Sequence, residues 1–321
     1  MKILITTGAA PDLDGISSAL GYVELLTQQG KECVAGFEGK PQLDAEFMLK
    51  HFKLNLPAIL QSFDEVILVD MGNKVYAPQI VQRFPEMVVK VIDHRVLHNV
   101  EMEFPSLRES NLDLVGACAT MVTEELYQHQ VTPSHTVATL LYAAIYSNTL
   151  YLKAGVTTER DLRAAECLAA SYPMSQELIE EMFAFRTRLS KDQLVFVLQN
   201  DFDVNGDSPD GTFGIAQLET LDASSLFAEY REIIHQTLLQ LREEYKLDYV
   251  FLTAPGIKQE ANYLYAPDEA TRAFLCRYFA GHLAPYDDRE TPGEILLTNK
   301  LLLRKEIKPI FQHAPAIEQD L

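Results

Sequence analysis

The chain is poor in cysteine. Its 321 residues include four, namely Cys33, Cys118, Cys167 and Cys276, and no two of them form a CxxC pair. Zinc ribbons and thioredoxin-like redox sites are built on such pairs, so the sequence argues against both classes. We expect the four thiols to be small, buried apolar side chains of a protein that resides in a reducing compartment.

The chain also lacks a long apolar run. Its longest runs, such as residues 137–145, are much shorter than the roughly 20 residues that span a bilayer. The first residues, 2–6, already resemble a strand, and no basic, apolar and cleavage segments occur in series, so we expect no signal peptide. These features predict a cytoplasmic protein without a membrane partner.

Basic residues are scarce as well. The 27 lysines and arginines are outnumbered by 46 aspartates and glutamates, which gives a formal net charge of −19. Such a field repels nucleic acid and anionic lipid surfaces, so neither is expected as a partner. It repels phosphate too, so a phosphate ligand would need metal ions or local basic side chains at its site.

What is present in the first half is an alternation of short β-branched segments with helical patterns. The strand-like segments are residues 3–7, 33–37, 66–70 and 88–93, and helical spacing occurs for example at 16–26 and 76–84. This alternation predicts an α/β fold in which a parallel sheet carries helices on both faces.

The pattern changes in the second half. Helical spacing dominates up to about residue 189, and strand patterns at 194–198 and 212–218 then precede a long helix at 224–245 and a strand at 249–252. We therefore predict a larger domain at residues 1–188, a hinge linker at 189–194 and a smaller α/β domain at 195–321.

Acidic residues lie at the ends of three predicted strands. Asp12 and Asp14 follow the first strand, and Asp70 and Asp93 end two later ones. Ligands of parallel sheets bind at the carboxyl ends of the strands, so we expect these carboxylates to converge. Because carboxylate oxygens bind hard cations such as Mn²⁺ and Mg²⁺, the pattern predicts a divalent metal site.

Each of these residues also has a purely structural explanation. Asp14 could cap the helix that begins at Ile16, and Asp70 could be a solvated carboxylate at a strand end. His94 follows a strand, where a histidine is more often structural than a ligand. If His94 does bind a metal, Asp93 is suited to orient its ring. The presence of three acidic strand ends in one sheet favours the metal site.

The order of these motifs resembles that of the DHH phosphoesterase superfamily, in particular the manganese-dependent (family II) inorganic pyrophosphatases. The matching segments are Pro-Asp-Leu-Asp at 11–14, Leu-Val-Asp at 68–70, Ile-Asp-His at 92–94, Val-Gly-Ala-Cys-Ala-Thr at 115–120, Ser-Asn-Thr at 147–149, Thr-Thr-Glu-Arg at 157–160, Gly-Ile-Ala-Gln-Leu-Glu-Thr at 214–220 and Leu-Arg-Lys at 303–305. The resemblance covers nearly the whole chain.

The resemblance implies a DHH metal-binding domain followed by a DHH-associated domain of type 2. It implies one or two Mn²⁺ or Mg²⁺ ions, with Asp70 as the central ligand in a set of Asp12, Asp14, Asp70, His94 and Asn148. The implied reaction is hydrolysis of a phosphoanhydride or phosphoester, most simply pyrophosphate or a short polyphosphate, by metal-activated water.

Basic side chains have an implied role in the same reaction. Arg95 would act beside Asp70 and His94 in catalysis, and Arg95, Arg304 and Lys305 would bind the substrate phosphates. The structural alternative for Arg304 and Lys305 is a solvated strand end. The expected partner is a small phosphate-containing substrate, and a homodimer is compatible with this expectation.

Four positions depart from the pyrophosphatase pattern. Gly8 replaces a metal-binding histidine, Arg95 replaces the second DHH histidine as in the prune-type branch, Asn148 replaces an aspartate, and Asn200 aligns loosely with a substrate-binding lysine. The alternative function is therefore an impaired family member that binds a phosphate ligand or a protein partner. A nuclease of single strands is a third class, which the charge of −19 argues against.

Overall fold

A computed structural model describes residues 1–59, 63–95, 99–187, 189–279, 282–285 and 295–312. The chain divides into two compact units. Unit 1 comprises Met1–Leu152 and Val156–Met182, and unit 2 comprises Lys153–Gly155 and Phe183–Leu321. The expected boundaries at 1–188, 189–194 and 195–321, including the hinge, remain predictions.

Unit 1 contains a five-stranded sheet in the order β2-β1-β3-β4-β5. Its strands are β1 (Lys2–Thr6), β2 (Glu32–Ala35), β3 (Glu65–Val69), β4 (Val88–Asp93) and β5 (Glu109–Leu112). Every pair of neighbouring strands is parallel, which confirms the predicted sheet. The carboxyl ends of all the strands therefore lie at one edge of the sheet.

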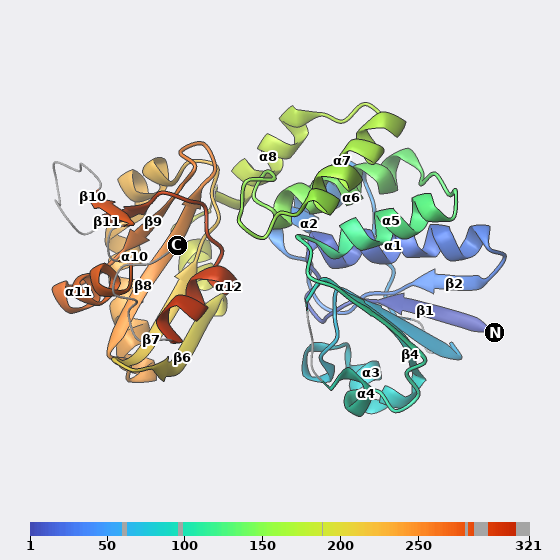
Figure 1. Cartoon of the computed structure of the whole chain (residues 1–321), viewed down its shortest axis with the longest axis horizontal. Helices are drawn as coiled ribbons and strands as arrows, with labels where there is room; N and C mark the ends of the chain where they lie inside the picture. Colours follow the sequence, from blue (N-terminus) through green and yellow to red (C-terminus); the bar gives the residue numbers. More distant parts are fainter. Residues whose placement is uncertain (60–62, 96–98, 188, 280–281, 286–294, 313–321) are drawn as a thin grey trace. The chain divides into compact units, whose positions relative to one another are not determined.

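Helices cover both faces of this sheet, as predicted. The helices of unit 1 are α1 (Leu13–Gln28), α2 (Leu43–His51), α3 (Gln79–Arg83), α4 (Val100–Glu103), α5 (Cys118–Gln128), α6 (His135–Asn148), α7 (Glu159–Ser171) and α8 (Gln176–Thr187), the last of which continues into unit 2, and short 3-10 turns occur at η1 (Lys74–Tyr76) and η2 (Pro85–Met87). Figure 1 shows α1 and α5 on one face and α3 and α4 on the other.

The apolar run at residues 137–145 forms the middle of α6. All nine of its side chains are buried, because α6 packs against α1, α5 and α7. A helix that is apolar on all sides is typical of a position inside a helical layer. Among the described residues, no helix has the length and apolarity needed to cross a membrane.

Unit 2 is built on a six-stranded mixed sheet in the order β10-β11-β9-β8-β7-β6. Its strands are β6 (Phe202–Ser208), β7 (Gly211–Gln217), β8 (Tyr249–Gly256), β9 (Ala261–Tyr265), β10 (Leu283–Pro285) and β11 (Ile295–Thr298). Its further elements are α9 (Lys191–Asn200), α10 (Ala223–Tyr245), α11 (Glu269–Tyr278), α12 (Arg304–Ile307) and the 3-10 turn η3 (Lys308–Gln312). A second, smaller α/β unit is therefore present, as predicted.

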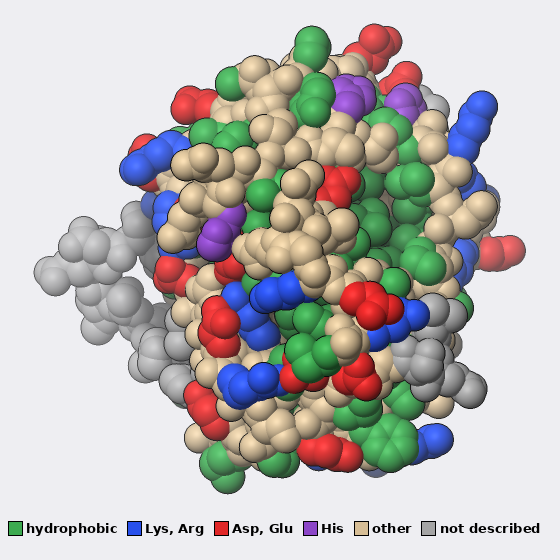
Figure 2. Space-filling model, turned by 90° about the vertical axis from the view of Figure 1, so that its right-hand side faces the viewer, with side chains coloured by type: hydrophobic (Ala, Val, Ile, Leu, Met, Phe, Trp, Pro, Cys, Tyr) green, Lys and Arg blue, Asp and Glu red, His purple; other side chains and the backbone are tan. Residues whose placement is uncertain are grey.

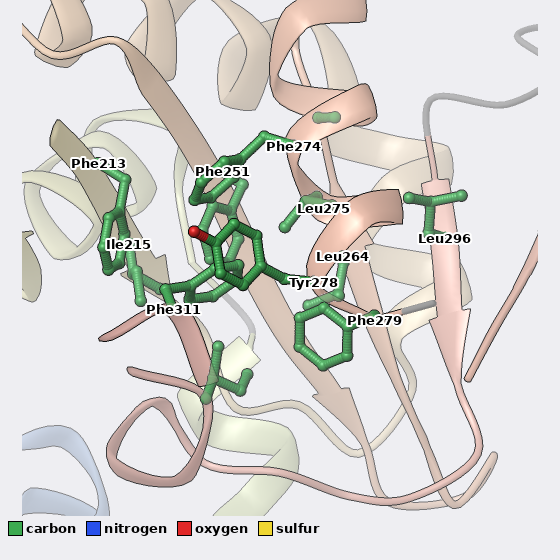
Figure 3. Packing of buried hydrophobic residues seen from close by; sticks show 12 residues of the cluster. Phe213, Ile215, Phe251, Leu264, Phe274, Leu275, Tyr278, Phe279, Leu296 and Phe311 are labelled. Carbon is green, nitrogen blue, oxygen red and sulfur yellow. The ribbon is translucent and has the colours of Figure 1, made fainter. Parts of the chain in front are cut away.

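Aromatic side chains form the core on one face of this second sheet. Phe311, from η3, is fully buried, with its ring centroid 4.9 Å from that of Phe274 on α11 and 5.0 Å from that of Phe213 on β7. Figure 3 shows these rings with Phe251 and Tyr278 in one cluster. The last described turn of the chain is thus fixed to the sheet by apolar burial.

Two predicted elements were wrong in detail. Residues 194–198 form part of helix α9 and not a strand, because Ser190 and Gln193 make a capping box at its start. The apolar run Leu-Val-Phe-Val-Leu fits either period, and burial of Leu194 and Leu198, four residues apart, selects the helix. The predicted helix at 76–84 is interrupted at Pro78, so that η1 and α3 replace it.

The expectation for the cysteines was also wrong in part. Only Cys118 is buried, whereas Cys33 is half-buried and both Cys167 and Cys276 are exposed. Cys167 and Cys276 lie on the outer faces of the amphipathic helices α7 and α11, where the helical period turns them away from the core.

Candidate metal centre

Asp12 is the N-cap of α1. Its Oδ1 accepts a hydrogen bond from the backbone N–H of Gly15 at 2.8 Å. The capping role considered for Asp14 is thus performed by Asp12. Gly15 is required here, because a Cβ at this position would lie 2.3 Å from Oγ1 of Thr7, just after β1. The close approach holds both carboxylates at the end of that strand.

Asp14 is buried and caps a different helix. Its Oδ2 accepts the N–H of Cys118 at 2.8 Å, and its Oδ1 accepts the N–H of Ala119 at 2.7 Å. These donors belong to the first turn of α5, whose own N-cap residue, Ala117, provides no side-chain cap. A carboxylate at a helix N-terminus is favoured by the helix dipole, so Asp14 ties α1 to α5.

Asp70 follows β3 in the left-handed backbone conformation, with φ of 51°. Its N–H donates to the carbonyl oxygen of Ile92 on β4 at 2.8 Å, so the chain stays paired with the sheet while it turns. Aspartate tolerates this conformation better than most residues. The side chain is almost completely buried, with a residue exposure of 6%.

His94 follows β4, and its ring is oriented by backbone. Nδ1 lies 3.0 Å from the carbonyl oxygen of Val115. A carbonyl only accepts, so Nδ1 must carry the hydrogen, and Nε2 is the nitrogen that faces Oδ1 of Asp70 at 3.4 Å. Val115 therefore takes the orienting position at Nδ1 that the sequence suggested for Asp93.

Arg95 binds the carboxylates on either side of His94. Its Nε donates to Oδ1 of Asp93 at 2.8 Å, and its Nη2 donates to Oδ1 of Asp70 at 3.0 Å. Burial lowers the pKa of Arg95, but the charges of Asp70 and Asp93 outweigh it and raise this pKa. Burial raises the pKa of Asp93, and the charge of Arg95 opposes that rise. The guanidinium is thus a fixed positive charge beside Asp70.

Three of the predicted ligands converge. Asp14, Asp70 and His94 each offer a ligand atom, and these atoms all lie within 4.8 Å of one another. All three side chains are buried. Two carboxylates and one imidazole suit Mn²⁺ and, less specifically, Mg²⁺. The residues present therefore fit a divalent metal ion.

The electrostatics of the cluster also favour a cation. Burial, with the charges of Asp70 and Asp44 adding to it, raises the pKa of Asp12 to about 8. Burial, with the charge of Asp12 adding to it, raises the pKa of Asp14 to about 7. Carboxylates with raised pKa values in one buried cluster are relieved when a cation binds among them.

One further acid near the cluster was missed by sequence reasoning. Asp44, near the start of α2, is buried at 5% exposure, and its Oδ2 accepts a hydrogen bond from Ser147 at 2.9 Å. The helix dipole favours an aspartate in the first turn of any helix, so the sequence gives no reason to place Asp44 at the metal centre. Only its position beside Asp12 in the structure does so.

Asn148 lies against the cluster at the end of α6. Its Nδ2 donates to Oδ2 of Asp14 at 2.6 Å. This contact shows where the side chain is, and the suggestion that it ligates a metal stays a prediction.

Arg304 and Lys305 belong to unit 2, where they begin the short helix α12 and do not end a strand. Nη2 of Arg304 lies 2.6 Å from Oδ1 of Asp201, and Lys305 is exposed. Asn200, at the end of α9, donates to the carbonyl oxygen of Phe196 at 2.7 Å. Their proposed contacts with substrate remain predictions.

A pocket of about 900 Å³ lies in unit 1 away from this cluster. It is lined by the amino-terminal ends of the strands, opposite the acidic edge, and by Tyr22 and Glu125. Inside it, Lys90 is paired with Glu109 at 2.6 Å and with Glu125 at 3.5 Å. The pocket is large, but its buried lysine is paired and the carboxylates that converge with an imidazole lie elsewhere, so we place the chemistry at the acidic edge.

The chain is a two-unit α/β protein, with an acidic cluster at the edge of a parallel sheet and a separate unit built on a mixed sheet. Residues 2–145 match the family model described as the DHH family, N-terminal domain. This part of the chain is therefore similar to DHH-family N-terminal domains, and the resemblance inferred from its motifs is confirmed.

The similarity to known proteins covers residues of both units. A probable manganese-dependent inorganic pyrophosphatase of Clostridium acetobutylicum is 27% identical over 274 residues, covering 84% of this chain and 86% of the relative. A manganese-dependent inorganic pyrophosphatase of Methanothrix thermoacetophila is 24% identical over 98% of both chains.

Solved structures show the same fold. The crystal structure of a Methanococcus jannaschii putative family II inorganic pyrophosphatase aligns with a TM-score of 0.67 at 20% identity, over 98% of this chain and 99% of the other. An exopolyphosphatase-related protein from Bacteroides fragilis aligns with a TM-score of 0.51 at 13% identity, over 97% of this chain and 90% of the other.

Proposed function

We propose that this protein is a metal-dependent phosphohydrolase that cleaves inorganic pyrophosphate or a short polyphosphate. The observation that carries the proposal is the convergence of Asp14, Asp70 and His94 at the edge of the sheet, with Val115 fixing the ring of His94. The names of the pyrophosphatase relatives support the same reaction.

Asp14, Asp70 and His94 would hold the ion, which is Mn²⁺ or Mg²⁺, and Asp12 would add its negative charge beside them. Once bound, such an ion lowers the pKa of a water molecule and offsets the charge of a phosphate. Asp14 is held by two backbone N–H groups and His94 by Val115, so both are oriented before metal arrives. Arg95 would donate to a phosphate oxygen beside them.

Unit 2 would act as the DHH-associated domain and supply Arg304 and Lys305 to the substrate. We further propose that residues 189–194 are a hinge that permits closure on the substrate. Small-angle scattering with and without Mn²⁺ plus imidodiphosphate should show a smaller radius of gyration in the liganded state. An unchanged radius would count against the hinge.

A small substrate agrees with the charge of the protein better than a nucleic acid does. The net charge is −19, and Figure 2 shows a face on which basic side chains lie among acidic and hydrophobic ones. Nucleic-acid sites instead gather basic and aromatic side chains on one face.

Phosphate release from pyrophosphate, tripolyphosphate and a phosphomonoester tests the proposal with Mn²⁺, Mg²⁺ and Co²⁺. Turnover should require metal and should be abolished by Asp70→Asn. Asp248→Asn is a matched control, because Asp248 accepts hydrogen bonds from Thr212 in unit 2. Wild-type turnover by Asp70→Asn would refute the site.

The second candidate is an impaired relative that binds a phosphate ligand or a protein partner without turnover. It is favoured by Gly8 and Asn148, which replace a histidine and an aspartate of the pyrophosphatase pattern. Calorimetry with Mn²⁺ and imidodiphosphate measures binding, and the release assay with pyrophosphate measures turnover. Tight binding of imidodiphosphate with no phosphate release from pyrophosphate supports the impaired relative.

A further inference from the structure

Position 8 has no side chain, and the flexible end of Met71 lies beside it. A Cβ added to Gly8 would lie 2.6 Å from Cε of Met71 and 3.4 Å from the carbonyl oxygen of Tyr76. Any side chain here would have to displace the end of Met71. The end of a methionine side chain can move, so it is the glycine itself, without a side chain, that offers no ligand to the cluster of Asp14, Asp70 and His94.

Asn148 adds no charge to the cluster. Its amide nitrogen, which carries hydrogens, is directed at Oδ2 of Asp14 at 2.6 Å. It offsets the charge of Asp14, whereas an aspartate at this position would increase the negative charge. The two altered positions thus leave the three converging groups as the metal-binding set.

A positive charge already occupies the other side of Asp70. Nη2 of Arg95 donates to Oδ1 of Asp70 at 3.0 Å and to its backbone oxygen at 2.8 Å, while Nε is held by Asp93. The arginine side chain is 46% exposed, in contrast to the 7% of Asp70. Among the described residues Nη1 has no hydrogen-bond partner, so one edge of the guanidinium is anchored and the other is accessible.

We propose that the centre binds a single divalent ion at Asp14, Asp70 and His94, and that the guanidinium of Arg95 takes the place of a second cation. A second divalent ion on Asp70 would lie beside this fixed positive charge and be repelled by it. Nη1 is then the donor that meets a phosphate oxygen next to the metal. This inference rests on the proposed function.

The number of bound ions tests the first part of the inference. Titration of the full chain with Mn²⁺, followed by calorimetry and electron paramagnetic resonance, should give one ion per chain with the six-line spectrum of an isolated ion. Two ions with an exchange-coupled spectrum would overturn the inference but leave the proposed hydrolase standing. One bound ion without any phosphate release would support the inference and refute the proposed hydrolase. No Mn²⁺ binding at all would refute the inference and the hydrolase together.

The charge of Arg95 tests the second part. Arg95→Gln should bind Mn²⁺ about tenfold more tightly because a neighbouring positive charge is removed, and its Mn²⁺ form should bind inorganic phosphate about tenfold more weakly. Arg95→Lys, which keeps the charge, should bind Mn²⁺ as the wild type does. An arginine with only a structural role would weaken both affinities on removal, so weaker Mn²⁺ binding by a folded Arg95→Gln would overturn the inference. Thermal melting of both variants verifies folding.

Discussion

Oδ1 of Asp14 on α1 lies 2.7 Å from the backbone nitrogen of Ala119, in the first turn of α5. One carboxylate thus caps a distant helix and also belongs to the metal-binding cluster. The two uses are compatible when a cation displaces a side-chain donor, because Oδ1 also accepts a hydrogen bond from Ser18 and Oδ2 also accepts one from Asn148. Loss of this residue should therefore affect both folding and metal binding.

Asp14→Ala should lower the free energy of unfolding by about 2 kcal/mol, since two buried N–H groups lose their acceptor. It should also abolish Mn²⁺ binding. Urea denaturation and calorimetry measure the two effects. Asp222→Ala is the matched control, because Asp222 caps α10 in unit 2, and its loss should destabilise the protein by about 1 kcal/mol without affecting metal binding. Equal metal binding by both variants would contradict the assignment.

The stability of the metal-free protein should fall as the pH rises from about 5 to 8. Asp12 and Asp14, with pKa values raised to about 8 and about 7, keep protons in the folded state that the unfolded chain has already lost. A group with a raised acid pKa therefore costs stability with increasing pH, at up to about 1.4 kcal/mol per pH unit for each retained proton.

The measurement is urea denaturation in EDTA at several pH values, with Asp12→Asn as the comparison. The variant keeps a cap oxygen but does not titrate, so its curve should be flatter than that of the wild type. Mn²⁺ should restore stability most strongly at high pH, where it competes with fewer protons. Parallel pH curves for the two proteins would show that Asp12 titrates normally.

His94→Ala should discriminate between metals. The imidazole suits Mn²⁺ better than Mg²⁺, which prefers oxygen ligands, so Mn²⁺ affinity should fall at least about tenfold more than Mg²⁺ affinity. Competition binding with both ions measures the ratio. His51→Ala, which removes an exposed histidine at the end of α2, serves as the control and should change neither affinity. An equal loss for both metals in His94→Ala would mean that His94 acts through folding alone.

Phe311→Ala should destabilise unit 2 by about 3–5 kcal/mol, because it removes a fully buried ring from the aromatic cluster. Phe196→Ala, in which a ring that is 65% exposed is removed, should cost much less. Chemical denaturation compares the two variants. Mn²⁺ binding to Asp14, Asp70 and His94 in unit 1 should persist in both, and its loss in a folded Phe311→Ala protein would contradict a centre contained in unit 1.

The sequence by itself was enough for the parallel sheet and for the acidic residues at its edge. Runs such as residues 66–69, which are rich in β-branched residues and lie between turn-forming segments, favour a buried strand, and Asp70 and His94 are placed by the ends of their strands. The positions of Asp12 and Asp14 follow in the same way from the strand that precedes them.

The partners of those residues were decided by tertiary structure. Nothing local indicates that Asp14 caps α5, that Val115 orients His94, that Asp44 approaches Asp12, or that Met71 fills the space beside Gly8. These contacts join positions far apart in the chain or join side chain to backbone, and packing alone sets their geometry. For the same reason the run at 194–198 was ambiguous, because its apolar pattern fits a strand as well as a helix until Leu194 and Leu198 are buried together on one face.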